Sequence, residues 1–241
     1  MFSDEAKKGL LSFIGYGRPS APIWFIGAEE GLGGHMNHDD EENNLHARAK
    51  WQEFMDLDEA HQTLTEGGNN IDITEKIKRR KGSITVWLWM SRIALAYEGL
   101  MKWDDKKNKE KARKFVQTRL GRRNDTTFLT ELSPVPEKRT GEPKWLAELR
   151  TGNLSEKLYM ERETRIKDLL KLEKPKCVIC YGLGKKKEFA KLLGVDWVEL
   201  PETDRVFKAP KNSFFLLPFF GQGISHELVK GLVTHPSFLA Q

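Results

Sequence analysis

The sequence predicts an α/β protein with a parallel β-sheet that is flanked by helices on both faces. Short apolar runs recur along the chain and alternate with longer amphipathic segments, which is the order of β-α-β units. Glycine or proline follows several of these runs closely, as is typical of turns in which the chain leaves the end of a buried strand. Because no internal repeat or low-complexity linker interrupts the 241 residues, we expect a single domain over residues 1–241.

Four segments are expected to form the buried strands, because each is a short apolar run bounded by turn residues. They are Pro22–Gly27, Thr126–Thr130, Cys177–Tyr181 and Ser213–Leu217, with a shorter candidate at Val195–Leu200. Helical spacing predicts a short amphipathic helix near the N-terminus and helices over Leu45–Leu64, Ile84–Tyr97, Ser155–Leu172, Lys185–Leu193 and His226–Val233. Residues 28–42 hold six carboxylates, three glycines and two histidines, and are expected to form a loop.

Composition points to a soluble protein of the cytoplasm. Hydrophobic residues make up 39% of the chain, which is enough for a core, and no apolar run approaches the ~20 residues of a membrane span. The N-terminus lacks the basic-then-apolar order of a signal peptide. Cys177 and Cys180 lie three apart in a predicted strand and should point to opposite faces, so we expect buried, reduced thiols. We expect a monomer with no cofactor and no contact with membranes.

The positive charge is concentrated in two runs. Met101–Arg123 holds ten Lys/Arg against three Asp/Glu, a local balance of +7 in a chain whose net charge is +5. Lys76–Lys81 is a second basic run. Such patches are typical of a partner with a phosphate backbone, although a solvated helix face has the same composition. The residues expected to bind DNA are Lys78, Arg79, Arg80, Lys81, Arg122 and Arg123.

Three loops should leave the carboxyl ends of the predicted strands, where open parallel α/β sheets bind their ligands. They are Gly27–Gly34, Thr130–Pro136 and Pro218–Ser225. Their content is FIGAEEG at Phe25–Gly31, FLTELSPVP at Phe128–Pro136 and FFLLPFFGQGIS at Phe214–Ser225.

In this order the segments resemble the uracil-DNA glycosylase superfamily. That family carries a glycine-framed motif after its first strand, a middle strand that ends in a base-reading Asn, and a late His-Pro-Ser or Asn-Pro-Ser motif. The segment KPKCVICYG resembles its penultimate strand. The resemblance implies an N-glycosylase that flips a base out of the DNA stack and excises it.

The resemblance also implies roles for residues at the strand ends. Glu29 falls where the family orients the attacking water, and Glu30 stands beside it as a second catalytic candidate. Glu131 takes the position of the base-reading Asn, and Phe25 and Phe219 complete the set assigned to base recognition. In the late loop, Gln222 and Ile224 are candidates to enter the duplex, and His226 is a possible acid.

The departures from the family motifs shape the expected substrate. An ionised carboxylate at Glu131 only accepts hydrogen bonds and suits the exocyclic amine of cytosine, so a modified cytosine is favoured over uracil. Glycines at 31, 33 and 34 would leave a wide pocket, which fits sugar-bearing cytosines of phage DNA and a role in antiviral defence. Phe219–Gly221 replace the late motif, and two cysteines are too few for the iron–sulfur cluster of one branch.

Two other interpretations stay open. His35, His38 and Asp39, in the acidic loop, would suit a metal-dependent nuclease or hydrolase, although a solvated acidic loop has the same pattern and we expect no metal. The missing His/Asn-Pro-Ser motif instead favours a non-catalytic DNA-binding relative. A Rossmann-type nucleotide enzyme is disfavoured, because no GxGxxG follows the first strand.

Overall fold

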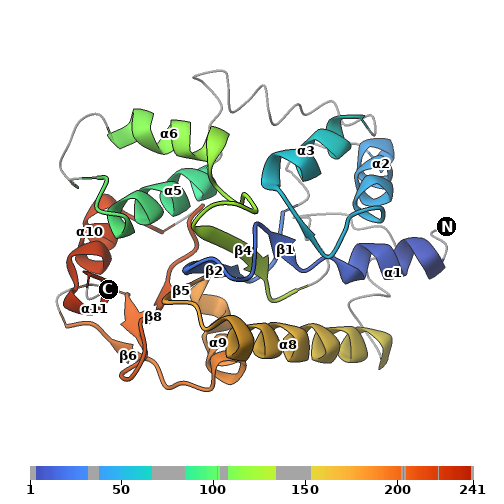
Figure 1. The fold of residues 1–241 in the computed structure, drawn as a ribbon. Helices are drawn as coiled ribbons and strands as arrows, with labels where there is room; N and C mark the ends of the chain where they lie inside the picture. The colour runs from blue at the N-terminus through green and yellow to red at the C-terminus, as the bar shows by residue number, and fades with distance from the viewer. Residues whose placement is uncertain are drawn as a thin grey trace.

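The computed structural model of the chain describes residues 4–31, 38–66, 85–101, 103, 108–133, 153–201, 203, 205–221 and 223–239. It is an α/β structure around one eight-stranded sheet (Figure 1). The basic residues Lys78, Arg79, Arg80 and Lys81, as well as Gln222 and His35, lie outside the described residues.

Four parallel strands form the centre of the sheet, in the order β4-β2-β5-β8. They are β2 (Ile23–Gly27), β4 (Thr127–Glu131), β5 (Cys177–Tyr181) and β8 (Phe214–Leu217). The four strands expected from the sequence are therefore confirmed to within one residue. They are found from sequence because each is a fully apolar run whose strand state needs no information from distant residues.

Short strands extend the sheet at both edges and make it mixed. β1 (Gly15–Tyr16) runs antiparallel to β4 and pairs with β3 (Phe54–Met55), while β7 (Phe207–Lys208) joins β8 antiparallel and carries β6 (Val198–Glu199). The strand expected at Val195–Leu200 is reduced to β6. A two-residue strand is too short to show the alternation by which strands are recognised in a sequence.

Helices cover both faces of the sheet, with α5 and α6 on one side and α8 and α9 on the other (Figure 1). The described helices are α1 (Asp4–Ser12), α2 (His38–Arg48), α3 (Leu57–Glu66), α5 (Thr85–Tyr97), α6 (Asn108–Thr118), α8 (Asn153–Glu173), α9 (Lys186–Leu193), α10 (His226–Thr234) and α11 (Pro236–Leu239), with a 3₁₀ turn at Leu183–Lys185. Ser225 caps α10, since its side chain accepts a hydrogen bond from the Leu228 amide.

Two hydrophobic cores result from the alternation of side chains along the strands. Phe25 and Cys177 belong to the core under α5, α6 and α10, whereas Trp24 and Cys180 belong to the core under α8 and α9. Both cysteines are fully buried and free, on opposite faces of the sheet. The predicted separation of the two thiols is therefore confirmed.

The single helix expected over Leu45–Leu64 is wrong, as is the loop expected to continue to residue 42. The chain forms α2 from His38, then β3, then α3 from Leu57. The carbonyl of Glu53 accepts hydrogen bonds from the Ile14 and Gly15 amides, and the carbonyl of Met55 accepts one from the Gly17 amide. These long-range backbone bonds to β1 outweigh the helical spacing of the apolar residues.

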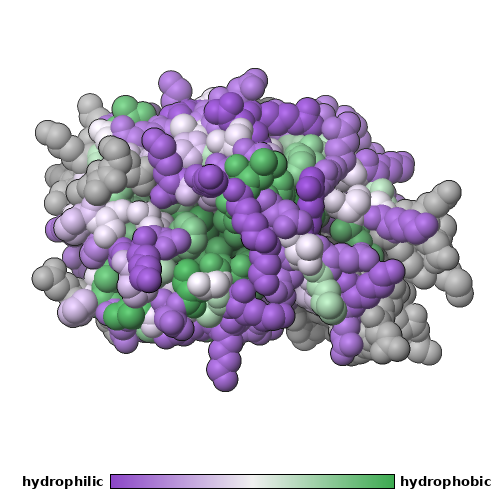
Figure 2. All heavy atoms as spheres, turned by 60° about the horizontal axis from the view of Figure 1, so that its bottom comes forward, coloured by the Kyte–Doolittle hydropathy of each residue, from purple (hydrophilic) through white to green (hydrophobic). Residues whose placement is uncertain are grey.

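Hydrophilic side chains cover most of the face shown in Figure 2, and apolar side chains gather in the hollow near its middle. Among the described residues, no helix is long and apolar enough to span a membrane.

Candidate functional site

The topology of the sheet places the candidate ligand site at the carboxyl ends of β2 and β5. These strands are neighbours, but the chain leaves β2 toward β4 on one side of the sheet and leaves β5 toward β8 on the other. In open α/β sheets, ligands bind in the crevice at such a switch point. The segments at this point are the loop after β2, the end of β4, the end of β5 and the loop after β8.

Glu131 and Tyr181 meet at this point across the end of β2. The Tyr181 hydroxyl donates a hydrogen bond of 2.6 Å to Oε1 of Glu131. Both side chains lie over Gly27, where an added Cβ would stand 1.8 Å from Oε2 of Glu131 and 2.4 Å from the Tyr181 hydroxyl. Gly27 therefore lacks a side chain because the carboxyl–phenol pair occupies that space.

Glu131 is a carboxyl group in an environment that favours its neutral form. Its Oε2 is shut off from solvent and has no hydrogen-bond partner among the described residues. Burial, helped by the charges of Glu30 and Glu29, raises the pKa of Glu131 to about 8, against the lowering effects of the Tyr181 hydrogen bond and the Arg162 charge. This shift favours the protonated form near neutral pH, and Oε2 is the oxygen left without a hydrogen-bond partner.

Aromatic rings line the same end of the sheet. The Tyr181 ring stacks on Phe220 at 4.7 Å between centroids, and the Phe219 ring lies 6.3 Å from the Tyr181 ring. Phe219 is 44% exposed although it is a large apolar residue, whereas Phe220 is buried. Phe25 is fully buried and packs edge-on against Phe220, so it supports these rings from beneath and has no surface with which to touch a base.

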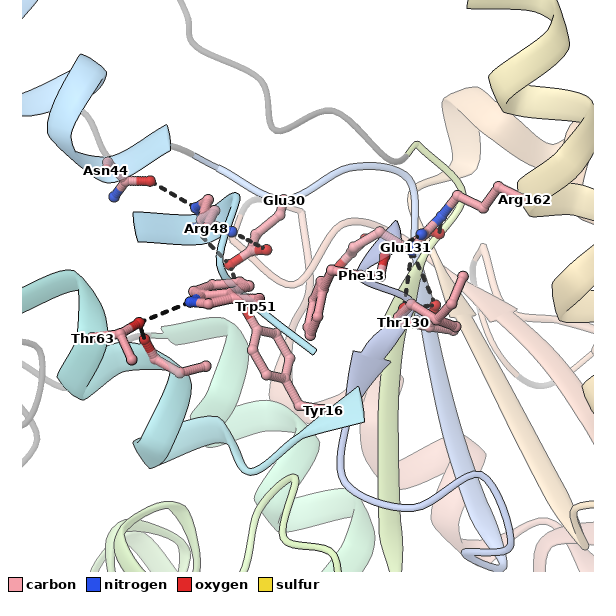
Figure 3. A network of polar contacts seen from close by, with 12 residues as sticks. Phe13, Tyr16, Glu30, Asn44, Arg48, Trp51, Thr63, Thr130, Glu131 and Arg162 are labelled. Carbon is pink, nitrogen blue, oxygen red and sulfur yellow. Dashed lines mark hydrogen bonds and ion pairs between the residues drawn. The ribbon is translucent and has the colours of Figure 1, made fainter. Parts of the chain in front are cut away.

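Glu30 lies in a buried ion pair. Arg48 donates to both of its carboxylate oxygens, at 2.7 and 3.1 Å, and the Tyr16 hydroxyl donates to Oε1 at 2.8 Å. Asn44 accepts a hydrogen bond from Nε of Arg48, and the guanidinium lies 4.6 Å from the Trp51 ring centroid (Figure 3). Burial alone would raise the pKa of Glu30, but the charge and hydrogen bonds of Arg48 outweigh it and lower that pKa. Glu30 is thus an ionised group that anchors the loop after β2 to α2.

Glu29, the other catalytic candidate, is the second residue after β2 and is partly exposed. Its charge acts on Glu131, which it makes harder to ionise. The structure therefore brings Glu29 and Glu131 to the same end of the sheet, as the sequence predicted for loops that leave β2 and β4.

Arg162 of α8 binds the backbone of Glu131. Its guanidinium donates to the backbone carbonyls of Glu131 at 2.7 Å, Phe13 at 2.7 Å and Ile14 at 3.0 Å, and to the Thr130 hydroxyl (Figure 3). These bonds satisfy carbonyls at the ends of β1 and β4 that the sheet leaves unpaired. The backbone that carries Glu131 is consequently fixed from the helix layer.

His226 lies at the first position of α10, after the loop that follows β8. Its Nδ1 accepts a hydrogen bond of 3.0 Å from the Trp103 indole, and its side chain is 46% exposed. Ile224, in the loop itself, is half-buried and packs against the core. The His226 side chain is therefore accessible to solvent, while Ile224 is partly withdrawn from it.

Arg122 and Arg123 are not brought to this site. They precede β4 and so lie at the amino-terminal edge of the sheet, opposite to Glu131. Arg122 forms an ion pair with Asp58, and Arg123 donates to the Phe54 carbonyl at 3.1 Å. Both arginines bind the segment around β3 and α3.

No group of three or more metal-ligating side chains occurs within the part of the chain that the structure describes. Of the proposed metal loop, His38 and Asp39 begin α2, and their side chains are outside that part.

Three residues of the site, Tyr181, Arg48 and Tyr16, were not predicted from the sequence. A signal for Tyr181 exists, because it is the last residue of an apolar strand before Gly182 and must face the carboxyl edge. Arg48 has no such signal, since its charge within a predicted helix is typical of a solvated position.

Comparisons of the chain with family models, with curated proteins and with solved structures give no match.

Proposed function

We propose that this protein is a DNA N-glycosylase that hydrolyses the glycosidic bond of a flipped, modified cytosine. The observation that carries the proposal is Glu131, a buried carboxyl group at the switch point of the sheet, whose burial favours its protonated form and whose Oε2 has no hydrogen-bond partner among the described residues. A carboxylic acid that stays neutral at pH 7 can donate a hydrogen bond or a proton to a substrate. The resemblance of the strand-end segments to uracil-DNA glycosylases supplies the reaction.

A donor at Oε2 takes the place of the ionised acceptor that was expected from the sequence, because burial favours the neutral form of Glu131, and this donor also favours cytosine over uracil. Ring nitrogen N3 of cytosine has a free lone pair, whereas N3 of uracil carries a hydrogen and needs an acceptor. Donation from Glu131 to N3 requires the carboxyl group to turn out from its buried position over Gly27. It would also withdraw electrons from the departing base, which is general acid catalysis. The exposed ring of Phe219, beside Tyr181, offers a surface on which a planar base can stack.

Glu29 is the residue proposed to orient the attacking water. Glu30 is less suited to that role, because Arg48 and Tyr16 already bind its oxygens. Excision of modified cytosines would act against phage DNA that contains them, which is the biological setting we propose.

An abasic-site assay tests the function. Duplexes carrying uracil, cytosine, 5-hydroxymethylcytosine or glucosylated 5-hydroxymethylcytosine are incubated with the protein and cleaved with alkali. We expect product from a modified cytosine, a loss of roughly 10²-fold or more in Glu131→Gln and in Glu29→Gln, and wild-type activity in Glu161→Gln. Glu161 is a suitable control because its side chain is 61% exposed on α8.

Two outcomes would contradict the proposal. Product from uracil alone would show that the substrate is wrong. No product from any duplex, with DNA still retained in a mobility-shift assay, would favour the non-catalytic DNA-binding relative, for which the replacement of the late motif by Phe219–Gly221 is the specific support.

A further inference from the structure

We infer that Arg205, on the turn between β6 and β7, binds a phosphate of the nucleic acid strand beside the Glu131 site. This inference rests on the proposed function, because it takes DNA as the ligand. Arg205 lies outside the two basic runs from which the sequence predicted contacts with the DNA backbone.

The register of the sheet places Arg205 at the correct edge. Phe207 of β7 pairs with Leu216 of β8, so the turn that precedes β7 lies beyond the carboxyl end of β8. A Cβ added to Gly223 would stand 3.7 Å from Nη1 of Arg205. The guanidinium therefore lies against the loop after β8, which also carries the exposed Phe219.

The backbone of Arg205 is strained. Its φ is 65°, in the left-handed region that residues other than glycine rarely adopt. Hydrogen bonds hold the turn: the Arg205 amide donates to Oε1 of Glu199 at 3.0 Å, the Leu200 amide donates to the Val206 carbonyl at 2.8 Å, and the Thr203 amide donates to the Leu200 carbonyl at 3.0 Å. Strain of this kind persists where the surrounding structure enforces it, and it is concentrated at binding sites.

The side chain of Arg205 is available for a ligand. The residue is exposed, and its guanidinium makes no hydrogen bond or ion pair with the residues that the structure describes. A guanidinium of this kind matches the geometry of a phosphate with two parallel hydrogen bonds. Glu202 and Asp204 flank it in the sequence, so Arg205 would provide a local contact and not a broad positive field.

Three lysines lie at the start of α9 and in the 3₁₀ turn that precedes it. Lys186 lies over the Phe207 ring, 3.5 Å from its centroid, and thereby joins the start of α9 to the β6–β7 hairpin. Its neighbours Lys185 and Lys187 are exposed and follow the carboxyl end of β5. A DNA strand that passes Arg205 toward the switch point would meet these lysines next.

The left-handed φ suggests a clean variant. Arg205→Gly removes the guanidinium and at the same time relieves the strain, so we expect an unchanged or higher Tm. Lys211→Gln is the matched control, because Lys211 is an exposed cation at the other end of β7, on the amino-terminal edge of the sheet.

Fluorescence anisotropy with plain and modified-cytosine duplexes over a range of salt concentrations tests the inference. We expect Arg205→Gly to weaken binding about tenfold on both duplexes. It should also reduce the slope of log K against log salt by about one. Lys211→Gln should bind like the wild type.

Wild-type affinity and salt slope in Arg205→Gly would overturn the inference, as would a loss confined to the modified duplex. The abasic-site assay is evaluated separately. If Arg205→Gly binds DNA more weakly but the wild type excises no base, the proposed glycosylase activity is wrong and the phosphate contact is still supported. A wild-type protein that binds neither duplex would overturn both.

Discussion

Glu30 and Glu131 are two carboxyl groups at one end of the sheet, and the fold shifts their pKa values in opposite directions. Arg48 and Tyr16 bind the oxygens of Glu30 and lower its pKa, whereas Glu131 has one phenolic partner and a pKa raised to about 8. Two carboxyl groups whose environments separate their pKa values are the usual basis for distinct acid and base roles. Here the ionised group, Glu30, holds a loop, and the group that burial keeps neutral, Glu131, is the proposed acid.

The raised pKa of Glu131 makes stability depend on pH. In the unfolded chain Glu131 ionises near 4.5, but in the folded protein it retains its proton up to about pH 8. Folding therefore becomes less favourable as pH rises through this window and levels off above it. We expect Glu131→Gln to raise Tm relative to the wild type more at pH 9 than at pH 5.

Thermal unfolding followed by circular dichroism at both pH values measures this difference. Glu161→Gln, on the exposed face of α8, should show the same change in Tm at pH 5 and pH 9. A Glu131→Gln difference that does not vary with pH would mean that Glu131 has an ordinary pKa in the folded protein.

Substitution of Arg48 should destabilise the protein more than substitution of most other polar residues. Its side chain is 5% exposed, and its loss would leave the Glu30 carboxylate buried without a cation. We expect Arg48→Met to lower the free energy of unfolding by roughly 3 kcal/mol. Adding Glu30→Gln should restore part of that loss, as measured by urea denaturation.

An exposed ion pair provides the comparison. Arg165 and Glu53 form a bridge of 2.6 Å with both side chains more than 40% exposed. Arg165→Met should therefore cost no more than about 1 kcal/mol. If Arg48→Met cost as little, the buried network around Glu30 would not hold the loop.

At the scale of elements, the site depends on how closely β4 and β5 approach over the end of β2. Gly27 ends β2, and the Glu131–Tyr181 pair occupies the space where its side chain would be. The Leu132 and Ser133 amides donate to the Gly27 and Ala28 carbonyls, so β4 follows β2 beyond the last paired strand residue. Neither strand can move away to make room.

We accordingly expect Gly27→Ala to displace the Glu131–Tyr181 pair. The new methyl group would destabilise the protein by about 1–3 kcal/mol and abolish excision in the abasic-site assay. Gly184→Ala, in the 3₁₀ turn after β5, is the control, because an added Cβ there meets no atom of the described residues within 4 Å. Equal effects of the two substitutions would show that the space above Gly27 is not specifically occupied.

At the scale of the whole molecule, helices bury the sheet on both faces, and the two cysteines report on this arrangement. Cys177 and Cys180 face different cores and are both fully buried, and burial raises the pKa of each thiol. We expect a thiol reagent to label neither cysteine in the native protein and to label both in denaturant. Rapid labelling of one cysteine under native conditions would mean that its helix layer opens easily.

The sequence by itself determined the four central strands, because their apolar runs and the turn residues around them are local signals. It also placed Glu29 and Glu131 at neighbouring strand ends, since the carboxyl ends of parallel strands share one edge. Only the tertiary structure decided the ionisation of Glu30 and Glu131, because Arg48 and Tyr181 reach them from 18 and 50 residues away. It likewise decided that Arg205 lies at the edge of the site and Arg122 at the opposite edge, because charge counted along a chain does not record which end of a strand it adjoins.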